Sequence, residues 1–522
     1  MTAVLLATLA ELILVAFACA ALLTGLSGSE PVRRLTVPVC LLGLAIAFFF
    51  TRAEPAWLAS ETYLLGGILH TGLAAFVQPL ALVAAALVLL VLPIDSRRRG
   101  CGDVPAMLLF SAAGVMLTAA SGDLITLFFA LELTSLPTYA MVVLARRHAA
   151  SHEAGVKYFF LGALSAALIV LGFGLIYGAT GQVELLELPI ACEQLHAGNV
   201  SGWWLLVSGL VISLLGLCFK LAAFPMHVYA GDVYCAAHPA VTAWLGFAPK
   251  AAGLFAMGLL FAAAGPVGPA GWTLPGALPV MIALIAVLSM TVGNLLALLQ
   301  QDVQRMMGYS SVAHSGYMLL GLLAGPAALA AGQGSGLSAV LFYLTGYLFM
   351  NFGVLAVLCY VRRENHPEQT VRSLDELAGL CTRSPLATVC LCICAASLIG
   401  LPPAVGFWGK LSVFSTALQA PLSWAALLVI IALVNSAISA TYYLRLVAAC
   451  FRSPIHAVAP ASDRFSLRFA VASAAALVLW FGLFPSRLAE PAAVAGELGT
   501  MFYGSASVSG SEPAALVTVR PD

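Results

Sequence analysis

Lysine is rare in this chain, and each lysine lies within an apolar stretch. The four are Lys157, Lys220, Lys250 and Lys410, and the other basic residues are arginines that fall mostly between such stretches. A buried ammonium group can change its protonation state, whereas a guanidinium stays charged. This distribution predicts side chains that gain and lose protons inside a membrane.

Two of the lysines accompany breaks in apolar stretches. Lys220 precedes Pro225, and Lys410 follows Pro402-Pro403 and three nearby glycines. Proline removes a backbone donor and interrupts a helix. Irregular backbone at membrane depth is tolerated only where protein or water surrounds it. We therefore expect a discontinuous helix at each of these two lysines.

Glu132 and Glu11 are the two acids that lie well inside apolar stretches. An intramembrane carboxylate is a functional candidate by default, and it needs a partner. We assign Lys220 as the partner of Glu132, so that the proton affinity of the lysine depends on how close the pair is. The alternative is a structural ion pair that only pins two helices together.

Lys250 follows Pro249 in the middle of its stretch, and we expect it to hold or release a proton at working pH. The alternative is that Lys250 stays charged and permanently paired to an acid. Lys410 is expected in the outer half of its helix as an exit group, or else snorkelling to the outer interface. Lys157 begins a stretch, where it either relays protons or snorkels.

His314 lies among Ser310, Ser311, Ser315 and Tyr317. Histidine can relay protons near neutral pH, so this polar segment predicts a relay, with a hydrogen-bonded core histidine as the alternative. Four further groups receive weaker predictions. Arg445 orders a site or meets a partner, Glu11 faces lipid headgroups or a neighbouring subunit, and His227 and His238 are loop polar groups.

The composition describes a membrane protein. Of 522 residues, 61% are hydrophobic and 9% are charged, with a mean hydropathy of +1.01, against about 25% charged residues in soluble domains. The net charge is zero, which gives no reason to expect nucleic acid binding. The twelve cysteines form no CxxC pair, so we expect no metal and no iron–sulfur cluster in this chain.

Hydropathy predicts an all-α polytopic membrane protein with about fourteen spans of roughly 20 residues each. They run approximately over 3–26, 35–52, 64–93, 105–121, 123–144, 155–180, 203–229, 238–263, 274–299, 303–325, 336–361, 385–420, 422–451 and 466–489. Fifteen arginines follow odd-numbered spans and three follow even-numbered ones, which places both termini outside the cytoplasm.

The spans group into two sets of five. Residues 105–263 and 274–451 each have a lysine and a proline break in their fourth span, and an odd number of spans makes the two sets inverted repeats. Inverted repeats with discontinuous helices are typical of ion transporters. Residues 1–104 form three N-terminal spans, 466–489 form the last one, and 490–522 are expected to be a loosely ordered tail.

Several of these segments together resemble subunit N of bacterial NADH-quinone oxidoreductase, an antiporter-like (Mrp-related) membrane subunit of respiratory complex I. The similar segments are Ala154–Ala163, Phe219–His227, Asp232–Tyr234, Ala248–Lys250, Gly293–Tyr317, Ser397–Pro403 and Gly406–Lys410. The chain departs from the family pattern at Cys235, where a glutamate is usual, and it lacks the usual proline before Asp232.

The resemblance implies roles for matching positions. Glu132 and Lys220 match the family's input pair, Lys250 its central lysine, His314 a histidine on the hydrated axis and Lys410 the terminal group. It also implies a non-redox subunit with no cofactor of its own. NADH, FMN, iron–sulfur clusters and quinone are then expected on partner subunits, and the antiporter-like subunit M and small subunits K, A and J are expected neighbours in a bacterial inner membrane.

These observations lead to one expected function and two alternatives. We expect outward proton translocation coupled to quinone reduction elsewhere in a complex. Moving one charge across the membrane costs about 2.3 kcal/mol per 100 mV, so uphill transport needs such coupling. The alternatives are an Mrp-like monovalent cation/proton antiporter and a structural spacer in which the lysines merely form ion pairs.

Overall fold

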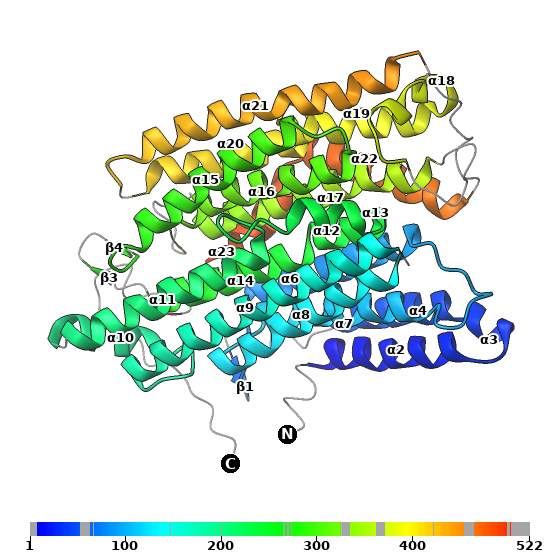
Figure 1. The fold of residues 1–522 in the computed structure, drawn as a ribbon. Coiled ribbons are helices and arrows are strands. Elements are labelled where there is room, and N and C mark those ends of the chain that lie inside the picture. Colours follow the sequence, from blue (N-terminus) through cyan, green and yellow to red (C-terminus); the bar gives the residue numbers. More distant parts are fainter. Residues whose placement is uncertain are drawn as a thin grey trace.

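The structure is a computed structural model, and it is a bundle of long, roughly parallel and antiparallel helices (Figure 1). It describes residues 8–52, 63–65, 67–146, 148–198, 200–264, 267–268, 271–272, 274–323, 325, 335–361, 371–420, 422–453, 464–497 and 502. The all-α fold class predicted from the sequence is confirmed, since only two short hairpins interrupt the helices among these described residues.

The N-terminal part contains three long helices and one hairpin. Its elements are α2 (Leu9–Leu26), α3 (Glu30–Arg34), α4 (Thr36–Arg52), β1 (Tyr63–Leu65), β2 (Ile68–His70) and α6 (Gly72–Val91). The predicted span 64–93 is therefore shorter than expected, because its first residues pair as an antiparallel hairpin with Leu64 opposite Leu69. Thr71 caps α6 by accepting a hydrogen bond from the amide of Ala74.

The next segment corresponds to the first predicted five-span set. It contains α7 (Asp103–Ala119), α8 (Leu124–Leu144), α9 (Ala149–Thr180), α10 (Leu188–Gly198), α11 (Val200–Leu221), α12 (Ala230–Ala236), α13 (Pro239–Leu245) and α14 (Ala248–Ala264), and is followed by β3 (Val267–Gly268) and β4 (Gly271–Trp272). Residues 222–229, between α11 and α12, are not helical and are called the first break below.

The segment that follows corresponds to the second predicted set. It contains α15 (Leu278–Leu298), α16 (Val303–Leu322), α17 (Gly336–Tyr360), a 3₁₀ turn at Asp375–Leu377, α18 (Leu380–Arg383), α19 (Pro385–Ile399), α20 (Val405–Gln419) and α21 (Ala425–Phe451). Residues 400–404, between α19 and α20, are called the second break.

Helix neighbours follow the same order in the two sets. In the first, α8 packs on α7 and α9, α11 packs on α9 and α14, and α14 returns to α7. In the second, α16 packs on α15 and α17, the α19–α20 pair packs on α17 and α21, and α21 returns to α15. The inverted repeat itself stays a prediction from the topology.

Eleven helices of the described chain are long and apolar enough to span a membrane, or twelve if one bent pair is counted. The predicted count of fourteen exceeds this number for three physical reasons. α7 has only 17 residues, α16 is rich in polar residues, and α19 and α20 are two 15-residue halves of one predicted span. The count of fourteen is not confirmed.

A further helix follows the last predicted span, 466–489. α22 (Phe465–Leu483) is followed by α23 (Ser486–Gly496), which packs on α17 and α6. Residues 490–496 are therefore helical, where the sequence predicted a loosely ordered tail from residue 490. Ser335, the N-cap of α17, donates its hydroxyl hydrogen to the carbonyl of Gly496 at 2.7 Å.

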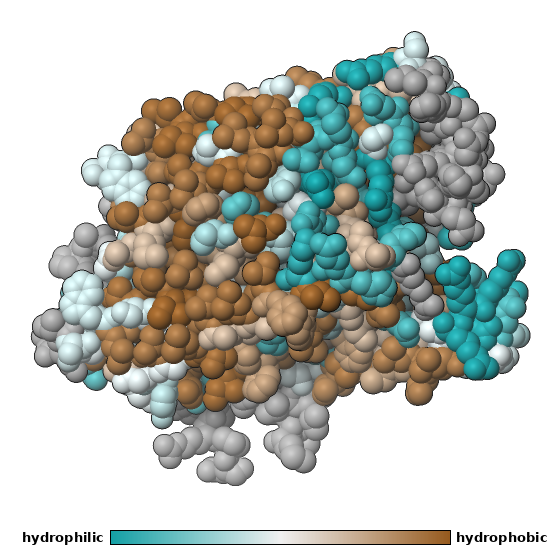
Figure 2. Space-filling view, viewed as in Figure 1, coloured by the Kyte–Doolittle hydropathy of each residue, from teal (hydrophilic) through white to brown (hydrophobic). Residues whose placement is uncertain are grey.

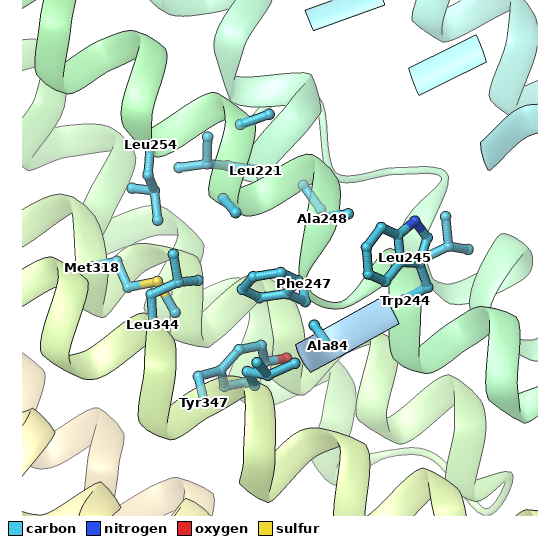
Figure 3. Close-up of a cluster of buried hydrophobic side chains, with 14 of the residues drawn as sticks. Ala84, Leu221, Trp244, Leu245, Phe247, Ala248, Leu254, Met318, Leu344 and Tyr347 are labelled. Carbon is cyan, nitrogen blue, oxygen red and sulfur yellow. The ribbon is translucent and has the colours of Figure 1, made fainter. Parts of the chain in front are cut away.

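α14 and α17 are buried along their whole length and form the centre of the bundle. In Figure 3, Leu221 at the end of α11, Phe247 before α14 and Tyr347 of α17 lie in the same apolar cluster. Ala222 and Ala223, at the start of the first break, are therefore buried in protein, whereas Pro225 and Val228 are exposed on the surface of the chain.

Hydrophobic side chains cover most of the face seen in Figure 2, while hydrophilic ones gather towards α3, α12 and α18. Arginines lie at this end of the bundle, among them Arg33, Arg97, Arg146, Arg372 and Arg452. We call it the arginine-rich end. The large exposed apolar side chains elsewhere suit contact with lipid or with neighbouring subunits.

Candidate functional site

The first break is held by hydrogen bonds from three directions. The amide of Ala223 donates to the carbonyl of Cys218, the amide of Phe224 donates to Ser289 Oγ at 2.9 Å, and the hydroxyl of Tyr229 donates to the carbonyl of Phe219 at 2.8 Å. Several of the backbone groups freed by the interruption thus find partners within the protein.

Lys220, in the last turn of α11, forms an ion pair with Glu132 of α8. Its Nζ lies 2.8 Å from Glu132 Oε1 and 2.8 Å from Ser135 Oγ. The lysine side chain is 1% exposed and the glutamate 16%. The partner predicted for Glu132 is confirmed as a contact. A buried pair of this kind costs desolvation for both charges, so loss of either partner leaves an expensive unpaired charge.

Lys250 of α14 has no acid among its hydrogen-bond partners. It donates to the carbonyl of Ser311 and to Ser315 Oγ, both on α16, and it is 1% exposed. Ser315 also bonds to the carbonyl of Leu221, the last residue of α11. One serine therefore connects the first break to Lys250.

His314 of α16 is enclosed by tyrosines from two other helices. Its Nδ1 lies 2.6 Å from the hydroxyl of Tyr343 on α17, and its Nε2 lies 3.1 Å from the hydroxyl of Tyr443 on α21. Tyr443 also hydrogen-bonds to Ser310. Both ring nitrogens are thus engaged by groups that can donate or accept a proton.

Lys410 of α20 points back into the second break. Its Nζ donates to the carbonyl of Ile399 at 2.8 Å, to the carbonyl of Leu398 at 3.1 Å and to Ser436 Oγ at 2.8 Å. The residue is 5% exposed. Snorkelling, the alternative raised by the sequence, is not what the structure shows, because this ammonium is bound to carbonyl groups inside the bundle.

Lys157 lies apart from these groups. Its side chain is 48% exposed and pairs with Glu153 at 2.8 Å and with Asp232 at 3.3 Å. All three residues line a pocket of about 210 Å³ at the arginine-rich end, together with Cys235, Arg305 and Arg372. Arg305 also pairs with Asp232. Lys157 is therefore a surface ion-pairing group rather than part of the buried arrangement.

Cys235 stands in that pocket where the family pattern has a glutamate. Its thiol donates to Asp302 Oδ2 at 3.3 Å. Burial, and then the nearby Asp302 carboxylate, raise the pKa of the thiol to about 11. A neutral thiol therefore occupies the position, and it carries no negative charge at neutral pH.

A comparison with known proteins gives this arrangement its context. The family described as "NADH:quinone oxidoreductase/Mrp antiporter, TM" matches residues 121–439, which include α8 with Glu132 and most of α21. The chain belongs to this family.

Relatives within the family cover most of the chain. A protein of Trichlorobacter lovleyi named "NADH-quinone oxidoreductase subunit N" is 37% identical over 79% of this chain and 80% of its own length. A protein of the same name from Nitrosomonas europaea is 33% identical over 92% of this chain and 95% of its own length. The chain is accordingly a multi-pass membrane protein.

Solved structures show the same fold. A chain of respiratory complex I from Thermus thermophilus with bound Aureothin matches with a TM-score of 0.75 and 31% identity, over 93% of this chain and 99% of that one. A chain of the Mrp complex from Dietzia sp. DQ12-45-1b matches with a TM-score of 0.77 and 21% identity, over 95% and 98%, which is a likeness in fold alone.

The weaker sequence predictions have mixed outcomes in this family member. Glu11 is 6% exposed and accepts a hydrogen bond from Gln78 Nε2 at 3.0 Å, so the prediction that it faces headgroups or a neighbour is wrong. Arg445 donates to the carbonyl of Gln300 at 2.5 Å, which fits an ordering role. His227 and His238 are non-helical as predicted, but both are buried, and His238 caps α13.

Sequence reasoning missed most of the hydroxyl and amide groups around the lysines. Tyr343, Tyr443 and Ser436 contact His314 or Lys410 directly. Asn294 and Asn435 hydrogen-bond to each other within the membrane part of the bundle, and Tyr442 donates to Asn294 Oδ1 at 3.0 Å. The two asparagines could have been predicted to have polar partners, because a polar side chain inside a long apolar stretch is costly unless it has one.

Proposed function

We propose that this chain is a proton-translocating, non-redox membrane subunit of an NADH:quinone oxidoreductase, of the subunit N type. It carries protons outward from the cytoplasm, and quinone reduction elsewhere in the complex drives the movement. The observation that carries the proposal is the buried series Glu132, Lys220, Lys250, His314 and Lys410, which runs from one broken helix to the other. We call this series the lysine axis.

Contacts within the lysine axis support proton transfer over a purely structural role. Glu132 can stabilise the charged form of Lys220, whereas the hydrogen-bond partners of Lys250 and Lys410 are carbonyl and hydroxyl oxygens. A lysine bound to neutral acceptors can give up its proton without leaving an unpaired acid behind. A structural spacer would gain nothing from lysines placed in this way.

The names of the relatives support other subunits of an NADH-quinone oxidoreductase as partners. We extend the proposal to the cofactors, so that NADH, FMN, iron–sulfur clusters and quinone would be bound by those other subunits. The subunit M-type antiporter-like chain and the small subunits K, A and J are the neighbours we propose, in a bacterial inner membrane with both termini on the outer side. The apolar faces exposed on the bundle are where such neighbours and lipid would pack.

An Mrp-like cation/proton antiporter is disfavoured by the interior acids. A Na⁺ or K⁺ site draws on carboxylate and carbonyl oxygens. Glu11 is bonded to Gln78 and Glu132 to Lys220, so both interior carboxylates already have partners. A ΔpH that depends on Na⁺ or K⁺ in vesicles treated with a quinone-site inhibitor would favour the antiporter instead.

Lys250→Ala in the intact complex tests the proposal. We expect NADH-driven quinone reduction and the accompanying ΔpH in membrane vesicles to fall at least about tenfold, because the central lysine cannot be bypassed. Lys157→Ala is the matched control, since Lys157 is exposed and paired at the surface. It should keep more than half of both activities.

Assembly must be checked for both variants, by native gels or by the recovery of the complex. If Lys250→Ala assembles and pumps normally at normal turnover, protons do not pass through Lys250 and the spacer interpretation gains support. If both variants lose activity equally, the distinction between buried and surface lysines is wrong.

A further inference from the structure

His314 is held at both ring nitrogens by phenol hydroxyl groups. The four residues Ser310, His314, Tyr343 and Tyr443 are each at most 1% exposed. Tyr343 lies 2.6 Å from Nδ1, Tyr443 lies 3.1 Å from Nε2, and Ser310 contacts the hydroxyl of Tyr443. The groups thus form a chain of hydrogen bonds across α16, α17 and α21, with Tyr442 beside Ser310 and Tyr443.

The chemistry of a neutral imidazole fixes the direction of this chain. One ring nitrogen carries a hydrogen and the other a lone pair. Of the two tyrosines, one must therefore donate to the ring while the other accepts from it. When Tyr443 and Ser310 follow the same polarity, the chain has two ordered arrangements, and they differ by the His314 tautomer.

The two ends of the chain lie towards opposite ends of the bundle. Tyr443 is eight residues from the end of α21 at the arginine-rich end, and Ser310 lies one turn before His314 on the same side. Tyr343 is seven residues from the start of α17, at the other end. Its ring lies directly against Gly409, the neighbour of Lys410.

Aromatic rings separate His314 from the two nearest lysines. The Nζ of Lys250 lies 5.7 Å from the ring centroid of Tyr347, whose ring is 4.8 Å from that of His314. The Nζ of Lys410 lies 5.2 Å from the ring centroid of Tyr317, which is 5.8 Å from His314. With an ammonium beyond a ring on either side, an imidazolium is repelled, so a neutral relay is favoured.

We propose that Ser310, Tyr443, His314 and Tyr343 form a hydroxyl–imidazole relay that moves protons past His314 by tautomer exchange. Ser310 gives its proton to the Tyr443 oxygen, Tyr443 gives its own to Nε2, Nδ1 gives one to the Tyr343 oxygen, and Tyr343 releases its own at the other end of the chain. The proton that enters replaces the one lost by Ser310, so one proton enters and one leaves. Each passage reverses the chain, so it must reorient before the next proton.

This relay rests on the proposed function and deepens it. It adds the hydroxyls of Ser310, Tyr443 and Tyr343 to the step that passes His314, between Lys250 and Lys410. It also assigns roles to Tyr343 of α17 and Tyr443 of α21, which belong to helices far apart in the sequence.

Changes of tyrosine to phenylalanine test the relay, because each removes one hydroxyl and keeps the ring. Tyr443→Phe removes the hydroxyl at Nε2, and Tyr343→Phe removes the hydroxyl at Nδ1. Tyr347→Phe is the control for both, because Tyr347 meets His314 through its ring. Each variant is measured in the complete complex, reconstituted in proteoliposomes, for protons moved per quinone reduced.

We expect Tyr443→Phe and Tyr343→Phe to lower proton translocation at least about fivefold and to change its solvent deuterium isotope effect, while Tyr347→Phe stays within twofold of the unmodified complex. A purely structural role would not change the isotope effect. If Tyr443→Phe and Tyr343→Phe both match Tyr347→Phe, the relay is overturned. Lys410→Ala, run alongside, separates the hypotheses: if it alone abolishes translocation the proposed function stands without the relay, and if it too pumps normally the proposed function fails.

Discussion

Each broken helix has a lysine next to its break, Lys220 before the first and Lys410 after the second, and the two lysines have different partners. At the first break, Lys220 is bound to the carboxylate of Glu132 and to Ser135. At the second, Lys410 is bound to the carbonyls of Leu398 and Ile399 and to Ser436. One lysine faces a full negative charge, and the other faces backbone and hydroxyl dipoles.

This difference indicates a division of labour. An adjacent carboxylate stabilises the ammonium form, and moving the carboxylate away removes that stabilisation, so a change in distance can switch Lys220. Carbonyl dipoles hold an ammonium less strongly than a carboxylate does, so Lys410 is suited to release its proton. The first break would respond to conformational change, and the second would pass protons on.

Among the variants that compare the two breaks, Glu132→Ala should cause the largest loss of activity. It leaves Lys220 buried without its counter-charge, at a cost of about 3–5 kcal/mol when the charge cannot escape. We expect quinone reductase activity and proton translocation to fall together by more than tenfold, as measured by NADH oxidation and ΔpH in vesicles.

Glu11→Ala is the control for the Glu132 substitution. It removes the other interior acid, whose partner is the neutral Gln78, and it should leave translocation within about threefold of normal. Equal losses in the two variants would mean that any buried carboxylate matters for stability, with no special role for the pair at the first break.

Gly400→Ala should have a smaller effect, confined to the second break. Gly400 has φ +94°, which L-residues rarely adopt, and an added Cβ would lie 3.1 Å from Lys410 Cδ. The backbone strain should cost about 1–2 kcal/mol, and the contact should displace the lysine. We expect translocation to fall about two- to fivefold, with a slightly lower thermal midpoint of the complex.

Gly181→Ala separates the backbone strain from the contact with Lys410. Gly181 also has a positive φ, +72°, but an added Cβ would meet nothing within 4 Å. Its substitution should lower the thermal midpoint similarly while leaving translocation unchanged. A loss of translocation in Gly181→Ala equal to that in Gly400→Ala would show that strain alone explains both.

The sequence was most informative where membrane burial makes a residue expensive. Lysines, an interior glutamate and prolines stand out in apolar stretches, so the two breaks and the pairing of Glu132 with Lys220 could be predicted. The same reasoning also gave a possible relay role to a lysine that lies outside the buried arrangement. Lys157 is as conspicuous in the sequence as Lys250, yet it lies half exposed at the surface.

The partners of His314 and Lys410 could not be predicted, because they depend on which helices meet. Tyr343 and Tyr443 are ordinary aromatic residues of apolar helices, and only the packing of α16 against α17 and α21 brings them to His314. Backbone carbonyls, such as those that bind Lys410, leave no trace in the sequence at all. The helix α23 was missed because its short, alanine-rich stretch is held by contacts with α17 and α6.

The most direct test of the division of labour is to replace each lysine at a break with arginine and to count protons moved per quinone reduced. Arginine keeps the charge and does not release its proton. We predict that Lys220→Arg retains a measurable fraction of translocation, because its ion pair with Glu132 can persist, and that Lys410→Arg falls at least about tenfold below it. Normal translocation by Lys410→Arg would contradict the account, since Lys410 would then have no need to release a proton.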